Sequence, residues 1–360
     1  MRFASVFAPG RRVIDKGNVD AGFVEAWSVP LDIAVLATSF LTAVLLAGVM
    51  GYAIQRGGTC TVGAIEQLIH EHRCQRFLSI LEAGVWVLAG LFIARALGLS
   101  INFPAGYPVG AMTIVGGVLL GLGAFVNGAC VFGSVARIGS GQWSYIATPL
   151  GFFLGCCVTG AVLAERPGAP IAYVEPSPRL VAAIAIALCI GLGWRVSSAL
   201  LRYRRRNGVG HLANLWQAFT RHVWEPDAAT CVIGIAFVGM LLLVGAWTYT
   251  DVLADLARGA PMSLLARGLL LLVLFAGALL GGYSAGRFRP ARLEAILLLR
   301  CLCGGALMGI GGGLVPGGND GLLLIGMPLL WPYAWIAFAA MAVTIAAAML
   351  WTSILARWRA

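Results

Sequence analysis

The sequence predicts an all-α integral membrane protein, and three observations support this class. Of the 360 residues, 60% are hydrophobic and a further 48 are glycine. Only 11% are charged, against about 25% in an ordinary soluble domain. The apolar runs are about 20 residues long, the length of a bilayer-spanning helix and too long for a barrel strand. A soluble enzyme and a nucleic-acid-binding protein are therefore excluded, and we expect the chain to lie in a lipid bilayer.

We expect about nine membrane-spanning helices. They cover residues 31–54, 77–98, 109–128, 144–164, 179–200, 229–249, 263–285, 293–315 and 333–356. Arginine is concentrated in alternate connecting loops, which the positive-inside rule assigns to the cytoplasm. This rule predicts a cytoplasmic C-terminus and an external N-terminus, and it explains the net charge of +10 without nucleic acid.

The predicted spans divide into two halves. We expect an N-terminal tail over residues 1–29 and a first transmembrane half over residues 30–201. A basic cytoplasmic linker then covers residues 202–228, where arginine is abundant, and a second transmembrane half covers residues 229–360. The tail lacks the continuous apolar core that a cleavable signal peptide needs.

The two halves contain a repeated segment. Gly117–Gly133 (GVLLGLGAFVNGACVFG) and Gly305–Gly321 (GALMGIGGGLVPGGNDG) align without a gap at a spacing of 188 residues, which is 305 minus 117. In the predicted topology the first copy enters the membrane from outside and the second from inside. The halves are therefore expected to be pseudo-symmetric and inverted, an arrangement that places substrate sites near the membrane midplane.

Three glycine-rich segments interrupt the apolar spans. They read RGGTCTVGAI over residues 56–65, VNGACVFGSVARIGSGQW over residues 126–143 and VPGGNDGLLLIGMPLLW over residues 315–331. Glycine costs a helix about 1 kcal/mol per site relative to alanine. Irregular backbone at membrane depth is tolerated only where it is buried in protein or lines a cavity. We therefore expect broken or re-entrant helices that line a transport path.

Cys60 and Cys130 are the cysteines most suited to a function, because each lies inside one of these interrupted segments. Cysteines inside ordinary spans behave as small apolar residues. Cys301 and Cys303 are two residues apart, so on a helix at most one of them can face a path. Arg137 follows the Cys130 segment and is a weaker candidate for attracting an anion.

No cofactor or metal site is expected. The sequence has no phosphate-binding loop, dinucleotide fingerprint, catalytic triad or zinc-protease motif. The nearest approach to a metal motif is His70, His72 and Cys74, which are better explained as a polar turn at the membrane interface.

The three interrupted segments resemble the signature loops of the YeeE/YedE family of sulfur-compound membrane transporters, and the resemblance extends from about residue 40 to residue 355. It implies an hourglass-shaped bundle that takes up thiosulfate across the bacterial inner membrane. It also implies that thiols near a central constriction contact the ion, and that a soluble sulfur-carrier or rhodanese-like protein is the cytoplasmic partner. Cys60 and Cys130 match two of the family's cysteines. Gly318 stands where the family carries a third, for which Cys303 is a possible substitute.

The resulting hypothesis is a transporter, not an enzyme, in which thiols pass a small sulfur-containing anion along a narrow path. Weak S–H donors suit a soft terminal sulfur, and weak successive contacts favour transit over trapping. The backbone around Gly58, Gly128, Gly317, Gly318 and Asn319 would supply N–H groups and space. Two alternatives remain open: a membrane redox or sulfur-transfer component with reactive cysteines, and a channel or scaffold in which the cysteines only pack.

Overall fold

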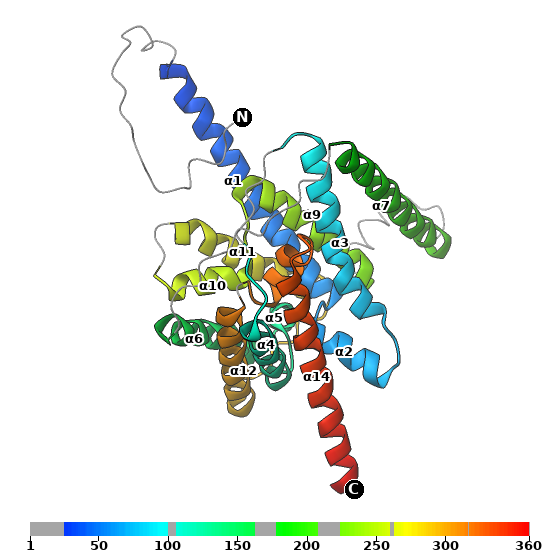
Figure 1. Ribbon diagram of the computed structural model, residues 1–360, viewed down its shortest axis with the longest axis vertical. Helices are drawn as coiled ribbons and strands as arrows, with labels where there is room; N and C mark the ends of the chain where they lie inside the picture. Colours follow the sequence, from blue (N-terminus) through cyan, green and yellow to red (C-terminus); the bar gives the residue numbers. More distant parts are fainter. Residues whose placement is uncertain are drawn as a thin grey trace.

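The computed structural model describes residues 25–99, 106–162, 178–207, 224–259, 263–315 and 317–359, and its elements are helices (Figure 1). The first half contains α1 (Glu25–Gly57), α2 (Thr61–His70), α3 (Gln75–Ala96), α4 (Ala111–Asn127), α5 (Val131–Gly139), a short 3₁₀ turn η1 (Trp143–Ile146) and α6 (Ala147–Val162). It is followed by α7 (Pro178–Asn207). The second half contains α9 (Pro226–Val244), α10 (Tyr249–Ala257), α11 (Ser263–Ser284), α12 (Ala295–Leu314), α13 (Gly318–Gly321), a π-helical turn η2 (Leu322–Gly326) and α14 (Pro332–Arg359).

The protein is an all-α, multi-pass membrane protein. Within the described residues, eight spans are long and apolar enough to cross a membrane, and they coincide with eight of the nine expected ones. Two of them, Val35–His70 and Ala111–Gly139, each combine two helices across a break. The remaining expected span, residues 179–200, is helical in α7, but its apolar stretch is only Val181–Gly191.

Four membrane helices are broken in the described part of the chain. The three expected breaks are confirmed, between α1 and α2, between α4 and α5, and between α12 and α13. A fourth break, between α9 and α10, was not predicted. Each break contains a glycine with positive φ, a conformation that other residues adopt only at a steric cost. These glycines are Gly58, Gly128, Gly245 and Gly317.

Helices of one half pack on helices of the other, and each such contact has an equivalent in which the two halves change roles, as a two-fold pseudo-symmetry requires. α6 packs along α12, and its counterpart α14 packs along α4. In the same way α1 packs on α11, and α3 packs on α9. The spacing of the sequence repeat extends to the helix starts: α2 and α10 begin at Thr61 and Tyr249, and α3 and α11 begin at Gln75 and Ser263. The repeat seen in one glycine-rich segment therefore covers most of both halves.

Glycine allows these helices to approach closely. A Cβ atom added at Gly309 of α12 would overlap the carbonyl oxygen of Phe152 in α6. Between α4 and α12, a Cβ atom at Gly123 would lie 2.6 Å from the carbonyl oxygen of Gly304. Small residues of this kind allow backbone-to-backbone packing in membranes, where the hydrophobic effect does not drive helices together.

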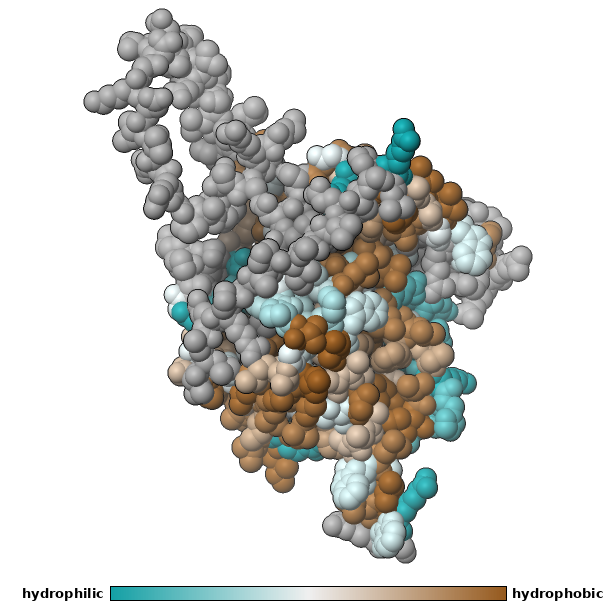
Figure 2. Space-filling view, viewed as in Figure 1, coloured by the Kyte–Doolittle hydropathy of each residue, from teal (hydrophilic) through white to brown (hydrophobic). Residues whose placement is uncertain are grey.

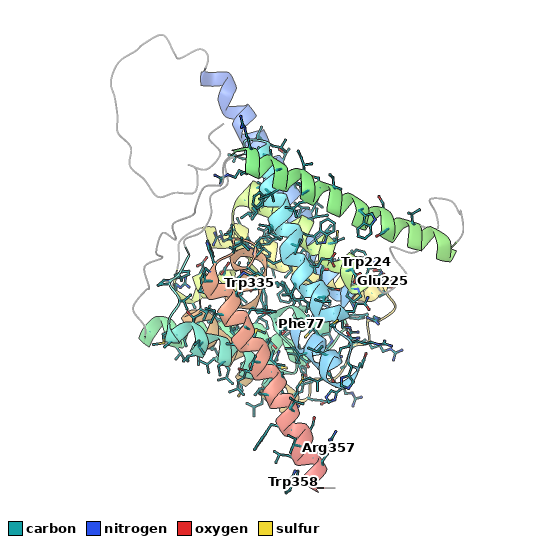
Figure 3. All side chains as sticks on the ribbon, turned by 45° about the vertical axis from the view of Figure 1, so that its right-hand side comes forward. Phe77, Trp224, Glu225, Trp335, Arg357 and Trp358 are labelled. Carbon is teal, nitrogen blue, oxygen red and sulfur yellow. The ribbon has the colours of Figure 1, made fainter. Side chains whose placement is uncertain are left out.

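The outer surface is apolar, as lipid contact requires. Figure 2 shows a broad hydrophobic surface over the middle of the bundle. Large apolar side chains are exposed on several helices, for example Leu45, Ile296 and Val343. Figure 3 shows Arg357 and Trp358 at the far end of α14, beyond the bundle. This combination of arginine and tryptophan is typical of the membrane–water interface.

The predicted linker is partly helical. α7 continues through the arginine-rich run to Asn207, six residues inside the linker expected at 202–228, and α9 already begins at Pro226. The physical reason is that arginine and leucine are good helix formers, so the charge run does not end the helix. Residues 208–223 and the tail before residue 25 lie outside the described residues.

Candidate functional site

Cys60 and Cys130 occupy equivalent places at two helix breaks. Each is the residue directly before a half-helix, Cys60 before α2 and Cys130 before α5. The backbone amide of Thr61, the residue after Cys60, donates to the sulfur of Cys130 at 3.2 Å, so the two cysteines are close neighbours. The fold thus brings together two thiols that are 70 residues apart in sequence, which is 130 minus 60. We call Cys60, Cys130 and the two adjoining helix N-termini the thiol site.

Gly133 makes room for the thiol site. A Cβ atom on Gly133 would overlap the sulfur of Cys60 and would lie 3.0 Å from its Cβ atom. Gly133 is in the first turn of α5, so this contact fixes how closely α5 can approach the end of α1. Position 133 therefore requires glycine because a larger side chain would clash with Cys60. The helical backbone at this position would by itself accept other residues.

A buried network around Asn127 holds the break between α4 and α5. The Asn127 amide donates to the carbonyl oxygen of Ala129 at 2.7 Å and to the hydroxyl of Ser134 at 3.3 Å. Its oxygen accepts from the Thr148 hydroxyl at 2.9 Å. Ser134 in turn donates to the carbonyl oxygen of Cys130 at 2.9 Å. The sequence analysis missed these residues, although a polar Asn beside the glycine of a broken span was the available signal.

The thiol site is connected to one face of the molecule. A small cavity of about 10 Å³ touches Cys60 and is bordered by Arg76 and Ser79 of α3. Ser79 also borders an open cavity of about 420 Å³ that includes His72 and Arg73 of the α2–α3 loop. The inner cavity holds about one water molecule, so an anion needs the surrounding side chains to move before it can pass.

The second half lacks thiols at the equivalent places. Thr248 corresponds to Cys60, and Gly318 corresponds to Cys130. A Cβ atom on Gly318 would lie 2.7 Å from the hydroxyl oxygen of Thr250, and the φ of Gly318 is +51°. Thr250 therefore fills the space that a cysteine at position 318 would need.

Asp320 ties α13 to the start of α10. Its carboxylate accepts from the backbone amides of Thr250 and Gly321, both at 3.1 Å, and from the Thr250 hydroxyl. Thr250 is the second residue of α10, so the carboxylate caps a helix N-terminus. Thr248 caps the same helix through its hydroxyl, which accepts from the amide of Asp251 at 3.2 Å.

Asn319 is a fully buried polar residue with unused hydrogen-bonding capacity. Its side chain is 0% exposed, and within the described residues neither amide atom has a hydrogen-bond partner. The same holds for the hydroxyl of Thr61 and the indole nitrogen of Trp247. Leaving such a group unsatisfied costs about 1–3 kcal/mol. α13 packs against α5, so Asn319 lies on the helix next to the thiol site. Sequence analysis selected Asn319 but missed Thr61 and Trp247.

Cys303 is not in a position to replace the absent thiol. It is exposed on α12, whereas Cys301 is buried in a cluster with Ala129 and Tyr145. The sequence offered Cys303 as a substitute thiol on condition that it points inward, and the helix turns it outward instead.

Arg137 lies at the surface end of α5, where its guanidinium donates to Gln142 at 3.1 Å and covers the Tyr145 ring. Its side chain is exposed, away from the buried thiols at the other end of the helix.

A metal site is not formed in the described part of the chain, where no group of three or more His, Cys, Asp or Glu residues is positioned to hold an ion. His70, His72 and Cys74 belong to the exposed turn between α2 and α3.

The family profile described as sulphur transport matches residues 56–347. The chain belongs to the sulphur transport family. It is also similar to the thiosulfate transporter TsuA of Escherichia coli (strain K12), with 22% identity over 331 residues that cover 84% of this chain and 91% of TsuA. The family match includes the four helix breaks of the described residues, so the thiol site and its counterpart in the second half both lie within the sulphur transport region. Membership of this family supports transport of a sulfur compound through the membrane.

Proposed function

We propose that the protein takes up thiosulfate, or a closely related small sulfur-containing anion, across the bacterial inner membrane. The observation that carries this proposal is the meeting of two cysteines, Cys60 and Cys130, at the N-termini of two half-helices inside the bundle. Similarity to a thiosulfate transporter supports the choice of anion. The protein is proposed to move the anion unchanged, so it is a transporter and not an enzyme.

The thiol site can compensate part of the free energy that an anion loses when it leaves water. Removing a charge from water costs several kcal/mol even after a protein relaxes around it. The N-termini of α2 and α5 present backbone N–H groups and the positive ends of helix dipoles, which favour anions. The thiols add weak, polarizable contacts suited to a terminal sulfur. Asn319 and Trp247 offer N–H groups with no protein acceptor, which would suit the oxygen atoms of the same anion.

The cavities suggest where the anion leaves the protein. The open cavity and the small cavity next to Cys60 lie at the α2–α3 turn, which carries Arg73 and Arg76. The positive-inside rule assigns this side to the cytoplasm, with the N-terminus outside. We propose that the anion exits there and that a soluble sulfur-carrier or rhodanese-like protein receives it.

Uptake of radiolabelled thiosulfate into cells that lack other importers tests the thiol site. The Cys130→Ala variant should lose uptake, because it removes the sulfur that interacts with Cys60 and accepts from Thr61. Cys130→Ser should retain part of the activity, because a hydroxyl can still donate and accept. Cys189→Ala, at an exposed site on α7, is the matched control and should transport normally. Normal uptake by a Cys60→Ala, Cys130→Ala double variant would refute the relay.

The direct contact between the two thiols also favours one other function. Adjacent thiols are the arrangement from which a disulfide or a persulfide exchange site is made. A membrane redox or sulfur-transfer component would therefore show a Cys60–Cys130 disulfide or a persulfide by mass spectrometry of protein isolated under alkylating conditions. A transporter of the proposed kind leaves both thiols unmodified during turnover.

A further inference from the structure

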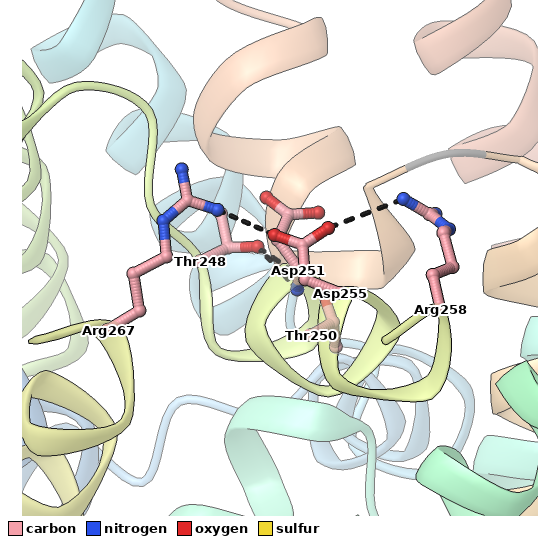
Figure 4. Close-up of polar contacts among 6 residues, drawn as sticks. All are labelled: Thr248, Thr250, Asp251, Asp255, Arg258 and Arg267. Atoms are coloured by element: carbon pink, nitrogen blue, oxygen red, sulfur yellow. Dashed lines mark hydrogen bonds and ion pairs between the residues drawn. The ribbon is translucent and has the colours of Figure 1, made fainter. Parts of the chain in front are cut away.

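Three carboxylates form a row from the buried core to the surface of the second half. Asp320 on α13 is 0% exposed. Asp251 and Asp255 follow on α10, one helical turn apart, and the side chain of Asp255 is 24% exposed. Figure 4 shows Asp251 and Asp255 beside each other on α10, with Arg267 and Arg258 on either side of the Asp255 carboxylate. The row thus leads from the N-terminus of α10 to the loop that follows it.

Asp320 differs from the outermost carboxylate in its electrostatic surroundings. Asp255 forms ion pairs with Arg267 at 2.6 Å and with Arg258 at 3.4 Å. Asp320 has hydrogen bonds but no ion pair with any cation in the described residues. A carboxylate that is buried without a cation is costly to keep charged, so binding a proton relieves the cost. Inside membranes, such residues mark proton pathways.

The elements that pack on α13 do not bring a cation to Asp320. α10 contributes Tyr249 and Asp251, whose charge interacts with Asp320, and η2 has no titratable residue. α5 contributes Cys130 at its start, and its Arg137 is exposed near its far end. The titratable residues of α12 lie in its first half, well away from the end that meets α13; they are Arg300, Cys301 and Cys303.

The row ends next to the thiol site. Asp320 follows Asn319, the buried amide without a partner in the described residues, and α13 packs against α5, the helix that directly follows Cys130. An anion held by the thiols and Asn319 would therefore be close to the Asp320 carboxyl. A charged carboxylate would repel it, whereas a protonated one would not, so proton binding and anion binding at this point favour each other.

Uptake of a dianion needs a source of energy. An inside-negative potential opposes entry of two negative charges, and each 100 mV lowers the accumulation at equilibrium by roughly three orders of magnitude. Protons that enter with the anion offset this charge. We propose that Asp320 carries a proton inward together with the anion and that Asp255 and Asp251 pass protons to it from the side of the membrane opposite the α2–α3 turn. The carboxylate binds H⁺ on that side and releases it toward the Cys60 opening after the anion leaves. This proposal rests on the proposed transport function.

Proteoliposomes that contain the full-length protein provide the test. Labelled thiosulfate uptake is measured with the membrane potential clamped at zero by potassium and valinomycin, with and without an inside-alkaline pH gradient. The gradient should raise the initial rate of the wild type severalfold. Asp320→Asn should lose this stimulation but still exchange external for internal thiosulfate without a gradient, because exchange needs no net proton movement. Asp320→Glu should retain the stimulation. The matched control Glu66→Gln, at an exposed carboxylate on α2, should behave as the wild type.

Two results would overturn the proposal. One is equal stimulation of the wild type and Asp320→Asn by the pH gradient. The other is a wild type that exchanges thiosulfate but does not respond to the gradient. If Asp320→Asn fails to fold, Asp251→Asn takes its place, and unchanged stimulation in that variant would equally refute the row as a proton route. Absence of thiosulfate exchange in the wild type is a separate result that refutes the transport function itself.

Discussion

At the scale of single residues, the thiol site depends on the smallest side chains beside it. Cys60 and Cys130 meet because Gly133 leaves space for the Cys60 sulfur. In the second half, the position equivalent to Cys130 is Gly318, and the Thr250 hydroxyl occupies the space that a side chain there would need. The two halves therefore share a backbone plan but differ in chemistry, with thiols on one side and hydroxyl and carboxyl groups on the other.

Gly133→Ala is predicted to lower thiosulfate uptake by about tenfold or more while the protein is still made. The added Cβ atom must displace the Cys60 sulfur, and overpacking of this kind costs ~1–3 kcal/mol. Gly63→Ala is the matched control on the other side of Cys60. A Cβ atom there would be 3.9 Å from both the Cys60 Cβ and an Arg76 nitrogen, an ordinary contact. The measurement compares thiosulfate uptake by the two variants at equal amounts of protein in the membrane. Equal rates would show that Gly133 has no special steric role.

At the scale of helices, the broken spans are stable because polar groups and close packing support each break. Asn127 satisfies backbone and side-chain groups where α4 ends, and Asp320 and Thr248 do so where α10 begins. The helices that pack beside the broken spans approach them closely, with glycine of one helix against the backbone of the other. The pairing of α6 with α12 illustrates this, because Gly309 lies against the Phe152 carbonyl.

Gly309→Leu is predicted to destabilise the protein clearly in detergent, because the side chain would separate α6 from α12. The matched control is Gly160→Leu. Gly160 lies on the exposed side of α6, and a Cβ atom there would meet nothing within 4 Å. Thermal unfolding followed by the loss of the monodisperse peak on size-exclusion chromatography measures the difference. A melting temperature for Gly309→Leu within the range of the control would contradict close glycine packing of these helices.

At the scale of the whole molecule, the pseudo-symmetric helices α2 and α10 lead from the helix breaks to different parts of the surface (Figure 1). The thiol site opens beside α2 at the turn with Arg73, and the carboxylate row follows α10. If the two halves are inverted, the opening beside α2 and the outer end of the carboxylate row lie on opposite sides of the membrane, as a transporter needs.

The orientation gives a prediction for Cys74, an exposed residue of the open cavity. In a variant with Cys74 as the only cysteine, a membrane-impermeant maleimide should label inside-out vesicles and spare right-side-out vesicles, because the arginine-rich turn is expected in the cytoplasm. The cysteine-free protein is the control for background labelling. Preferential labelling of right-side-out vesicles would reverse the predicted topology.

Much of the architecture follows from the sequence alone, because bilayer thickness and the cost of unpaired backbone leave few solutions for so apolar a chain. Helix type, three of the breaks and nine membrane spans, eight of which the structure has, were predicted this way. The family was predicted from the resemblance of the three interrupted segments to known signature loops. The break before Thr248 was missed because Gly-Ala-Trp-Thr lacks the run of glycines that marked the others.

The tertiary structure alone decided which residues meet. Local sequence marked Cys60 and Cys130 as unusual, but only the packing of α5 against the break after α1 brings their side chains into contact. In the same way, the chain separates Asp251 from Asp320 by a whole membrane helix hairpin, and the fold places them in one row. Contacts between residues so far apart in sequence depend on how each helix is rotated about its axis and packed on its neighbours. Composition and periodicity do not determine that rotation.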